Sequence, residues 1–148
     1  MRMKGVVYKA CVRSMLAYGV ETWAMKAGAF QRLQATERRM LRMICGVTLK
    51  DMVESTVIAS RVGVNDLEEH LRQKRLRWFG HIVRRDEEVE IKKVFELKIE
   101  GRRKRGRPVK RWIDVVEEDM KKRGVVQQDA GDREGWRRRA VKGLANPR

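Results

Sequence analysis

The chain has 148 residues and a formal charge of +16, from 36 Lys and Arg against 20 Asp and Glu. This length fits one domain or a piece of a larger one, and 42% hydrophobic residues with four Trp and eight Met are too many for a disordered tail. Two cysteines are too few for a disulfide scaffold, and no apolar run approaches the length of a membrane span. The composition therefore predicts a folded domain with a basic surface, and it argues against secretion and against membrane insertion.

The N-terminal region shows the spacing of one-faced helices. The first predicted helix ends at Gly19, the second runs from about residue 29 to Cys45 and stops at Gly46, and a short third helix over 54–61 is closed by Gly63. The apolar face of the first helix comprises Val7, Cys11, Met15 and Tyr18, and that of the second comprises Phe30, Leu33, Leu41 and Ile44.

The strongest helical pattern begins after Asn65 or Asp66, either of which suits an N-cap, and continues to about residue 83. One seam of this helix is apolar, and other positions carry four cations. The seam comprises Leu67, Leu71, Trp78 and Ile82, and the cations are Arg72, Lys74, Arg75 and Arg77. Two interpretations of these cations stay open, contact with phosphate or an ordinary solvated helix face.

The C-terminal part is predicted to hold two further helices. Residues 89–99 fit a short helix imperfectly, whereas Pro108 suits the first turn of a helix that buries Trp112 and ends at Gly124. A last helix over 132–144 buries Trp136. Because helical spacing recurs and strand alternation does not, we expect an all-α fold of five or six helices in one small bundle-like domain.

Three parts are expected along the chain. Residues 1–100 form a helical region, 101–111 a basic loop, and 112–148 a C-terminal pair of helices. Trp78, Trp112 and Trp136 each fall on an apolar seam, so we expect them on packed helix faces and not as platforms on which bases stack.

The run from Gly101 to Trp112 holds seven cations and no anion. Like charges at this density repel unless a polyanion neutralises them, and the glycines and the proline keep the segment out of helix, so its side chains can follow a curved backbone. Nucleic-acid phosphate suits this run best; a solvated basic loop or a localisation signal is the alternative. The predicted nucleic-acid contacts are Arg102, Arg103, Lys104, Arg105, Arg107, Lys110 and Arg111 of the run, with Arg72 and Arg75 of the preceding helix.

The tetrapeptide Arg105-Gly106-Arg107-Pro108 resembles the core of an AT-hook, in which an extended Arg-Gly-Arg lies in the narrow minor groove of A·T-rich DNA. Glycine lets the backbone approach the groove floor, and narrow A-tracts concentrate negative potential for arginine. The match is short, so a free-standing DNA-binding or chromatin module is a second hypothesis beside general phosphate contact.

No constellation of catalytic residues is visible in the sequence. The clustered carboxylates, such as those at 117–119, are adjacent on helices and therefore point apart, whereas two-metal chemistry needs carboxylates that converge. Cys11, Cys45, His70 and His81 lack the close spacing of a zinc site, and both cysteines are interpreted as small hydrophobic side chains. We expect no enzymatic activity of this chain alone and no metal or other cofactor.

Four landmarks in order resemble one protein family. They are Tyr18-Gly19-Val20-Glu21-Thr22-Trp23, Leu76-Arg77-Trp78-Phe79-Gly80-His81, Gly106-Arg107-Pro108 with Lys110-Arg111-Trp112, and Asp132-Arg133 with Trp136-Arg137. The series is similar to the C-terminal region, beyond the polymerase palm, of non-LTR (LINE-type) retrotransposon endonuclease-reverse transcriptases.

The resemblance implies a thumb-like or post-thumb helical segment that holds RNA and DNA while an upstream polymerase domain copies the template. The palm motif Tyr/Phe-x-Asp-Asp has no counterpart in this chain, so no catalytic residue carries over. The expected partners are RNA or DNA and, in a full-length protein, that polymerase domain, in the nucleus or in a cytoplasmic ribonucleoprotein. A truncated or domesticated copy and a pseudogene product without selected function both remain open, as do the preferred nucleic acid and the oligomeric state.

Overall fold

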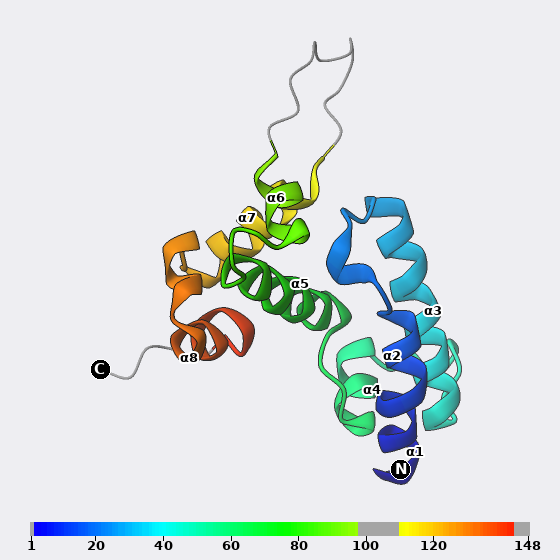
Figure 1. The fold of residues 1–148 in the computed structure, drawn as a ribbon. Coiled ribbons are helices and arrows are strands. Elements are labelled where there is room, and N and C mark those ends of the chain that lie inside the picture. Colours follow the sequence, from blue (N-terminus) through cyan, green and yellow to red (C-terminus); the bar gives the residue numbers. More distant parts are fainter. Residues whose placement is uncertain (1, 98–109, 144–148) are drawn as a thin grey trace. The chain divides into compact units, whose positions relative to one another are not determined.

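The computed structural model describes residues 2–97 and 110–143, and over these ranges the chain is helical, with no β-strand (Figure 1). The all-α prediction is therefore confirmed. Helical turns of different type join end to end, so the described residues form seven continuous helical rods besides two short 3-10 turns. The rods are α1–η1–α2 (Arg2–Val7, Tyr8–Val12, Arg13–Leu16), α3 (Ala27–Cys45), α4 (Ser55–Val62), α5 (Leu67–Val83), α6 (Glu90–Glu96), α7 (Trp112–Arg123) and α8–η4 (Arg133–Trp136, Arg137–Val141), and the 3-10 turns are η2 (Val20–Thr22) and η3 (Gln127–Gly131).

The helix ends follow the sequence signals closely. α3 stops where Gly46 adopts a left-handed φ of 66°, and α7 stops in the same way at Gly124 with a φ of 63°. Only glycine takes this conformation without strain, which is why both stops could be read from the sequence. The ambiguous stretch over 89–99 contains α6, because Phe95 has an aromatic cluster to pack against.

The chain divides into two compact units. Unit 1 comprises Met1–Val20 and Met25–Leu71, and unit 2 comprises Glu21–Ala24 and Arg72–Arg148. The boundary after Leu71 falls inside α5. The expected division at 100 and 111 follows the basic loop, of which residues 101–109 lie outside the described part, so that division stays a prediction.

Unit 1 has a mainly aliphatic core. α4 packs on α3 and contacts α1 (Figure 1), and the contact with α1 is close, because a Cβ on Gly5 would lie 2.3 Å from the carbonyl oxygen of Val62. A side chain at position 5 would therefore push the two backbones apart. The buried hydrophobic residues of unit 1 are Tyr8, Ala17, Val20, Leu41, Ile58, Val62, Val64, Leu67 and Leu71.

The predicted apolar face of the first helix is wrong. Val7, Met15 and Tyr18 are 59%, 77% and 87% exposed, and Cys11 is exposed too. Tyr8 and Ala17 are buried in their place. The predicted face is out of phase from its start, because Val7, which precedes the π-helical turn η1, is exposed and Tyr8 is buried. The π-helical turn then leaves five residues from buried Tyr8 to buried Arg13, a spacing that a regular 3.6-residue repeat misses.

A polar cluster lies inside unit 1. The buried carboxylate of Glu37 accepts a hydrogen bond from the Tyr8 hydroxyl at 3.0 Å and pairs with the buried Arg13 guanidinium, whose Nε lies 3.1 Å from the same oxygen. Burial raises the pKa of Glu37 above its usual value, although the charge of Arg13 acts against this shift. Burial and the neighbouring Glu37 likewise raise the pKa of Tyr8. The cluster ties the first helix to α3.

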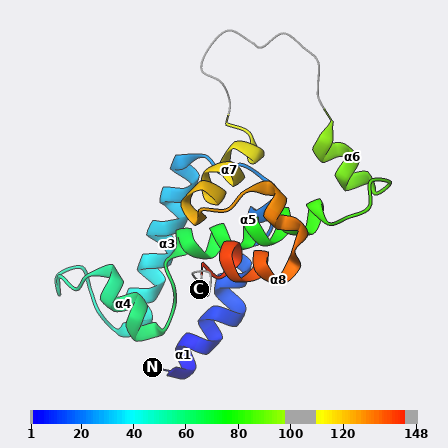
Figure 2. The same ribbon diagram turned by 90° about the vertical axis from the view of Figure 1, so that its left-hand side faces the viewer.

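Unit 2 has an aromatic core. The ring of Phe79 on α5 lies 5.8 Å from Trp136 of α8, 5.9 Å from Phe95 of α6 and 6.4 Å from Trp112 of α7, centroid to centroid. α7 and α8 both pack on α5 (Figure 2) through this group and its aliphatic neighbours. Phe79 is fully buried, so one residue of α5 organises the contacts of three other helices.

A buried ion cluster also joins α5 to α7. The Asp119 carboxylate lies 2.7 Å from Nε of Arg75 and 3.2 Å from Nε of Arg72. Asp119 and Arg75 are buried, and the Arg72 side chain is nearly so. These charges hold the two helices in register, because a buried carboxylate without its partners would be costly.

Candidate nucleic-acid interface

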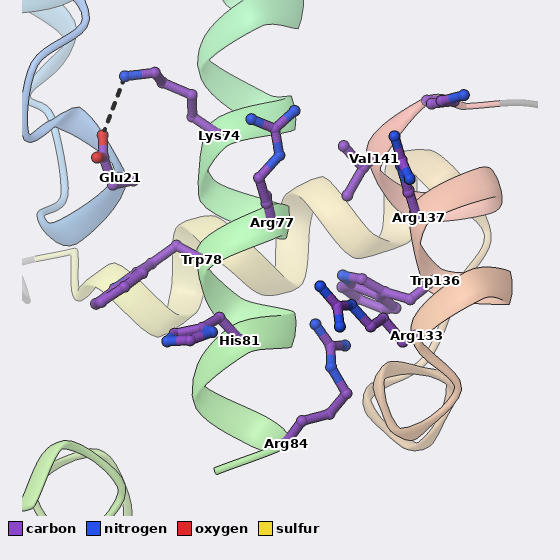
Figure 3. A pocket seen from close by; sticks show the side chains of 11 residues that line it. Glu21, Lys74, Arg77, Trp78, His81, Arg84, Arg133, Trp136, Arg137 and Val141 are labelled. Carbon is purple, nitrogen blue, oxygen red and sulfur yellow. Dashed lines mark ion pairs between the residues drawn. The ribbon is translucent and has the colours of Figure 1, made fainter.

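A hollow of about 740 Å³ opens between α5 and the α8–η4 rod within unit 2 (Figure 3). We call it the basic hollow. Its lining comprises Lys74, Arg77, Trp78, His81 and Arg84 from α5 and its C-terminal turn, Arg133, Trp136, Arg137, Val141 and Lys142 from the α8–η4 rod and its end, and Glu21. The volume lies in the usual range of ligand-binding pockets.

Helical spacing on α5 places the lining residues on one face. Lys74, Arg77, Trp78 and His81 follow the order i, i+3, i+4, i+7, and Arg84 comes three residues later, so their side chains line one stripe. Arg133, Arg137 and Val141 repeat at intervals of four along the opposite rod. In Figure 3, Arg133 and Trp136 point from this rod toward α5 and lie near Arg84, whereas Trp78 and His81 lie on the other side of α5. Each stripe is readable in the sequence; that both line one hollow is a property of the fold.

Gly80 sets the distance between the two rods. A Cβ at this position would lie 2.5 Å from Nε1 of Trp136, so only glycine lets the indole approach α5 this closely. The Trp136 Nε1–H donates a hydrogen bond to the Leu76 carbonyl oxygen at 2.8 Å, and the side chain is 1% exposed. The floor of the hollow is therefore a packed contact that exists before any ligand arrives.

The charge of the hollow is strongly one-sided. Glu21 is its one acidic lining residue among the described residues, and the Glu21 carboxylate lies 3.7 Å from Nζ of Lys74. The lining holds five further cations and no further carboxylate among the described residues. These cations are Arg77, Arg84, Arg133, Arg137 and Lys142.

Crowding of these cations is visible at Arg84. Burial, followed by the neighbouring guanidinium of Arg133, lowers the pKa of Arg84. The Arg84 side chain is held in place because it donates a hydrogen bond to the Ala130 carbonyl oxygen at 2.6 Å. An anion bound between Arg84 and Arg133 would relieve this repulsion.

Trp78 differs from the other two tryptophans for which packing was predicted. Trp136 is buried in the aromatic core and Trp112 packs against it, with its Nε1–H donated to the Glu21 carbonyl oxygen at 2.7 Å, so both predictions are confirmed. Trp78 is half-buried and belongs to none of the hydrophobic clusters of the described residues. Its indole stacks on the imidazole of His81, with ring centroids 5.4 Å apart and planes inclined by 25°.

The predicted contact residues of the basic run fall mostly outside the described part. This applies to Arg102, Arg103, Lys104, Arg105 and Arg107, and so to the Arg105–Pro108 motif. At the end of the run, exposed Lys110 pairs with Glu118 at 2.6 Å, and exposed Arg111 is the N-cap residue of α7. The end of the run therefore leads directly into α7.

Arg72 and Arg75 have a structural contact that the sequence did not predict. Both guanidinium groups lie on Asp119, and that of Arg75 is buried there. A different cation of α5, Arg77, is exposed to solvent and lines the basic hollow. For Arg77 the sequence left phosphate contact open as one of two interpretations. It predicted no site role for Arg84, Arg133, Arg137 and Lys142, although the four-residue spacing of Arg133 and Arg137 was an available signal.

Other site types find no support in the described residues. No group of three or more His, Cys, Asp and Glu side chains among them is placed to hold a metal ion. No helix in these ranges has the length and apolar character of a membrane span. Comparison with protein-family models, with curated proteins and with solved structures finds no match to the chain.

Proposed function

We propose that this chain is a non-catalytic nucleic-acid-binding protein that contacts its ligand through the basic hollow of unit 2 and through the basic run at 101–111. The observation that carries the proposal is the hollow itself, in which five cations from two facing rods meet one carboxylate that already has a lysine beside it. A polyanion is the partner that such a surface favours, and the phosphate backbone of RNA or DNA is a polyanion that can contact many cations at once.

The landmarks shared with non-LTR retrotransposon reverse transcriptases support the same proposal. Two of the four landmarks fall on residues that build unit 2, since Phe79 and Gly80 form the contact with α8, and Trp136 and Arg137 lie on the α8–η4 rod. The proposed role is that of a helical piece that holds RNA or DNA beside an upstream polymerase domain. Primer extension on an RNA template by the purified chain should therefore yield no product, and extension that survives a control for host enzymes would contradict the non-catalytic part.

The binding part is tested by neutral substitutions in the hollow. Each phosphate contact contributes roughly 0.7 on a single strand, or 0.9 on duplex DNA, to the slope of log K against log[salt]. Arg133→Gln with Arg137→Gln should weaken binding to oligonucleotides and flatten the slope by about 1 to 2 units. The matched control is Arg32→Gln with Arg39→Gln, two exposed arginines on α3 in unit 1, which removes the same charge elsewhere.

Equal losses for the hollow pair and the α3 pair would mean that net charge alone drives binding, and the proposal would fail. The basic run is tested in parallel by changing Arg102, Arg103, Lys104 and Arg105 to Gln, which should lower affinity for all sequences together. The AT-hook hypothesis makes a different prediction for Arg107→Gln, a loss restricted to A·T-rich duplex.

A further inference from the structure

We infer that the basic hollow takes single-stranded nucleic acid, with one base stacked on Trp78 while the surrounding arginines hold the flanking phosphates. This inference rests on the proposed function and specifies its ligand. The alternative within the same chemistry is a duplex held by its phosphates alone.

The first observation is the position of Trp78. On α5, Trp78 follows Lys74 by four residues and Arg77 by one, and it precedes His81 by three. All four residues line the same hollow. The Trp78 ring is half-buried and outside the aromatic core, whereas the indole of Trp136, the other tryptophan in the lining, is 1% exposed with its N–H occupied. One tryptophan of the hollow is thus used for packing, and the other presents an aromatic surface beside cations.

The second observation is that the orientation of this surface is fixed. The indole stacks on the His81 imidazole, and Arg85 donates a hydrogen bond from Nε to Nε2 of that ring at 3.2 Å. Trp78 and His81 are three residues apart on one face of α5, and Arg85, just beyond the end of this helix, holds the imidazole through its hydrogen bond. A stacking platform fixed in this way loses little side-chain entropy when a base binds.

The third observation is the combination of the two chemistries in one hollow. Aromatic surfaces flanked by arginine and lysine bind single strands, because every unpaired base has an accessible π-face and every nucleotide has a phosphate. The bases of a duplex are stacked on one another and cannot reach a side chain without being unstacked. A duplex would use the five cations of the hollow and leave Trp78 without a role in binding.

The test uses the full chain with three probes of equal length: an oligo(dT) single strand, a duplex, and a single strand built of abasic units that keeps the phosphates and lacks bases. Trp78→Leu keeps apolar bulk at the position, and Trp78→Phe keeps a smaller aromatic face. Trp23→Ala is the control, because Trp23 is 47% exposed in the same unit and does not line the hollow.

We expect Trp78→Leu to weaken oligo(dT) binding by about 5- to 100-fold, the range for loss of one base–aromatic stack. Trp78→Phe should recover most of this affinity, Trp23→Ala should have no effect, and no variant should change binding to the abasic strand. Thermal unfolding curves of both Trp78 variants should match that of the parent chain.

Two results would overturn the inference while the proposed function survives. One is that Trp78→Leu lowers the affinity for the abasic strand and for oligo(dT) equally, which would show that Trp78 supports the shape of the hollow and does not stack on a base. The other is duplex binding as tight as oligo(dT) binding, with neither affected by Trp78→Leu. If the parent chain binds none of the three probes, the proposed function fails and the inference fails with it.

Discussion

The two compact units of this chain are both helical, yet they use different interiors. Unit 1 packs mainly aliphatic residues and places a Tyr8–Arg13–Glu37 cluster among them, whereas unit 2 arranges three aromatic residues around Phe79 and places Asp119 between two arginines. The basic hollow belongs to unit 2. Large planar side chains hold two helical rods at a fixed separation there, and this gives a surface on which five cations can be crowded.

The comparison also shows what a close helix contact needs. In unit 1 the glycine at position 5 faces the backbone of α4, and in unit 2 the glycine at position 80 faces an indole. Both contacts join segments distant in sequence. The first only closes a core, whereas the second also forms the floor of the hollow.

The largest expected effect is that of Trp136→Ala. Removing this buried ring leaves a cavity in the aromatic core and should cost roughly 3–5 kcal/mol in the free energy of unfolding of unit 2. All four tryptophans belong to unit 2, so fluorescence of the remaining three reports on that unit. Amide exchange over α3 reports on unit 1 and should change less; an equal loss of protection in both units would show that they unfold together.

Asp119→Asn should cost about 3 kcal/mol, since it leaves a buried arginine without its ionic partner. The matched control is Glu118→Gln, which removes the neighbouring carboxylate of α7 from an exposed pair with Lys110 and should cost about 1 kcal/mol or less. Urea unfolding followed by tryptophan fluorescence measures both variants. Similar losses for the two would show that the burial of Asp119 is not what makes its pair important.

Three Gly→Ala variants compare close contacts in the two units with an open position. Gly80→Ala should destabilise unit 2 by about 1–3 kcal/mol, because its Cβ meets the indole of Trp136, and Gly5→Ala should affect unit 1 in the same direction. Gly28→Ala, in the first turn of α3 with nothing near its Cβ, should be neutral or slightly stabilising. Thermal unfolding and amide exchange assign each change to its unit. A neutral Gly80→Ala would mean that α8 can move away from α5, and the hollow would then not be preformed.

The smallest expected effect is a pH dependence in unit 1. Burial raises the folded-state pKa of Glu37 above its usual 4.5, so the folded state binds a proton more readily than the unfolded chain. The stability that this proton contributes is complete below about pH 4.5 and is lost as pH rises through the folded-state pKa.

The stability advantage of the parent chain over Glu37→Gln should therefore shrink as pH rises from 4.5 toward 8. Amide exchange over α3 at several pH values measures this difference in unit 1, and groups common to both chains cancel. An advantage that grows with pH would show that the ion pair with Arg13 outweighs burial.

Much of the fold could be predicted from particular residues. Gly46, Gly63 and Gly124 end helices as expected, and Trp112 and Trp136 lie on packed faces, because these features depend on local backbone geometry and on the period of one helix. The apolar face of the first helix could not be predicted in this way. Val7 is already exposed before the π-turn, and this turn then separates buried Tyr8 and Arg13 by five residues, a spacing that a regular helical repeat does not contain.

The candidate site, too, could be predicted only in part from the sequence. The sequence by itself determined a basic, all-helical chain with a run of seven cations and two arginine-bearing helix faces, since charge and periodicity are properties of neighbouring residues. Only the tertiary structure decided which arginines are used inside the protein and which face a ligand. Arg72 and Arg75 lie on Asp119, 47 and 44 residues away, while Arg84 and Arg133 meet across a gap that Gly80 and Trp136 define. Such contacts depend on the packing of helices far apart in the chain, so the spacing within one helix cannot reveal them.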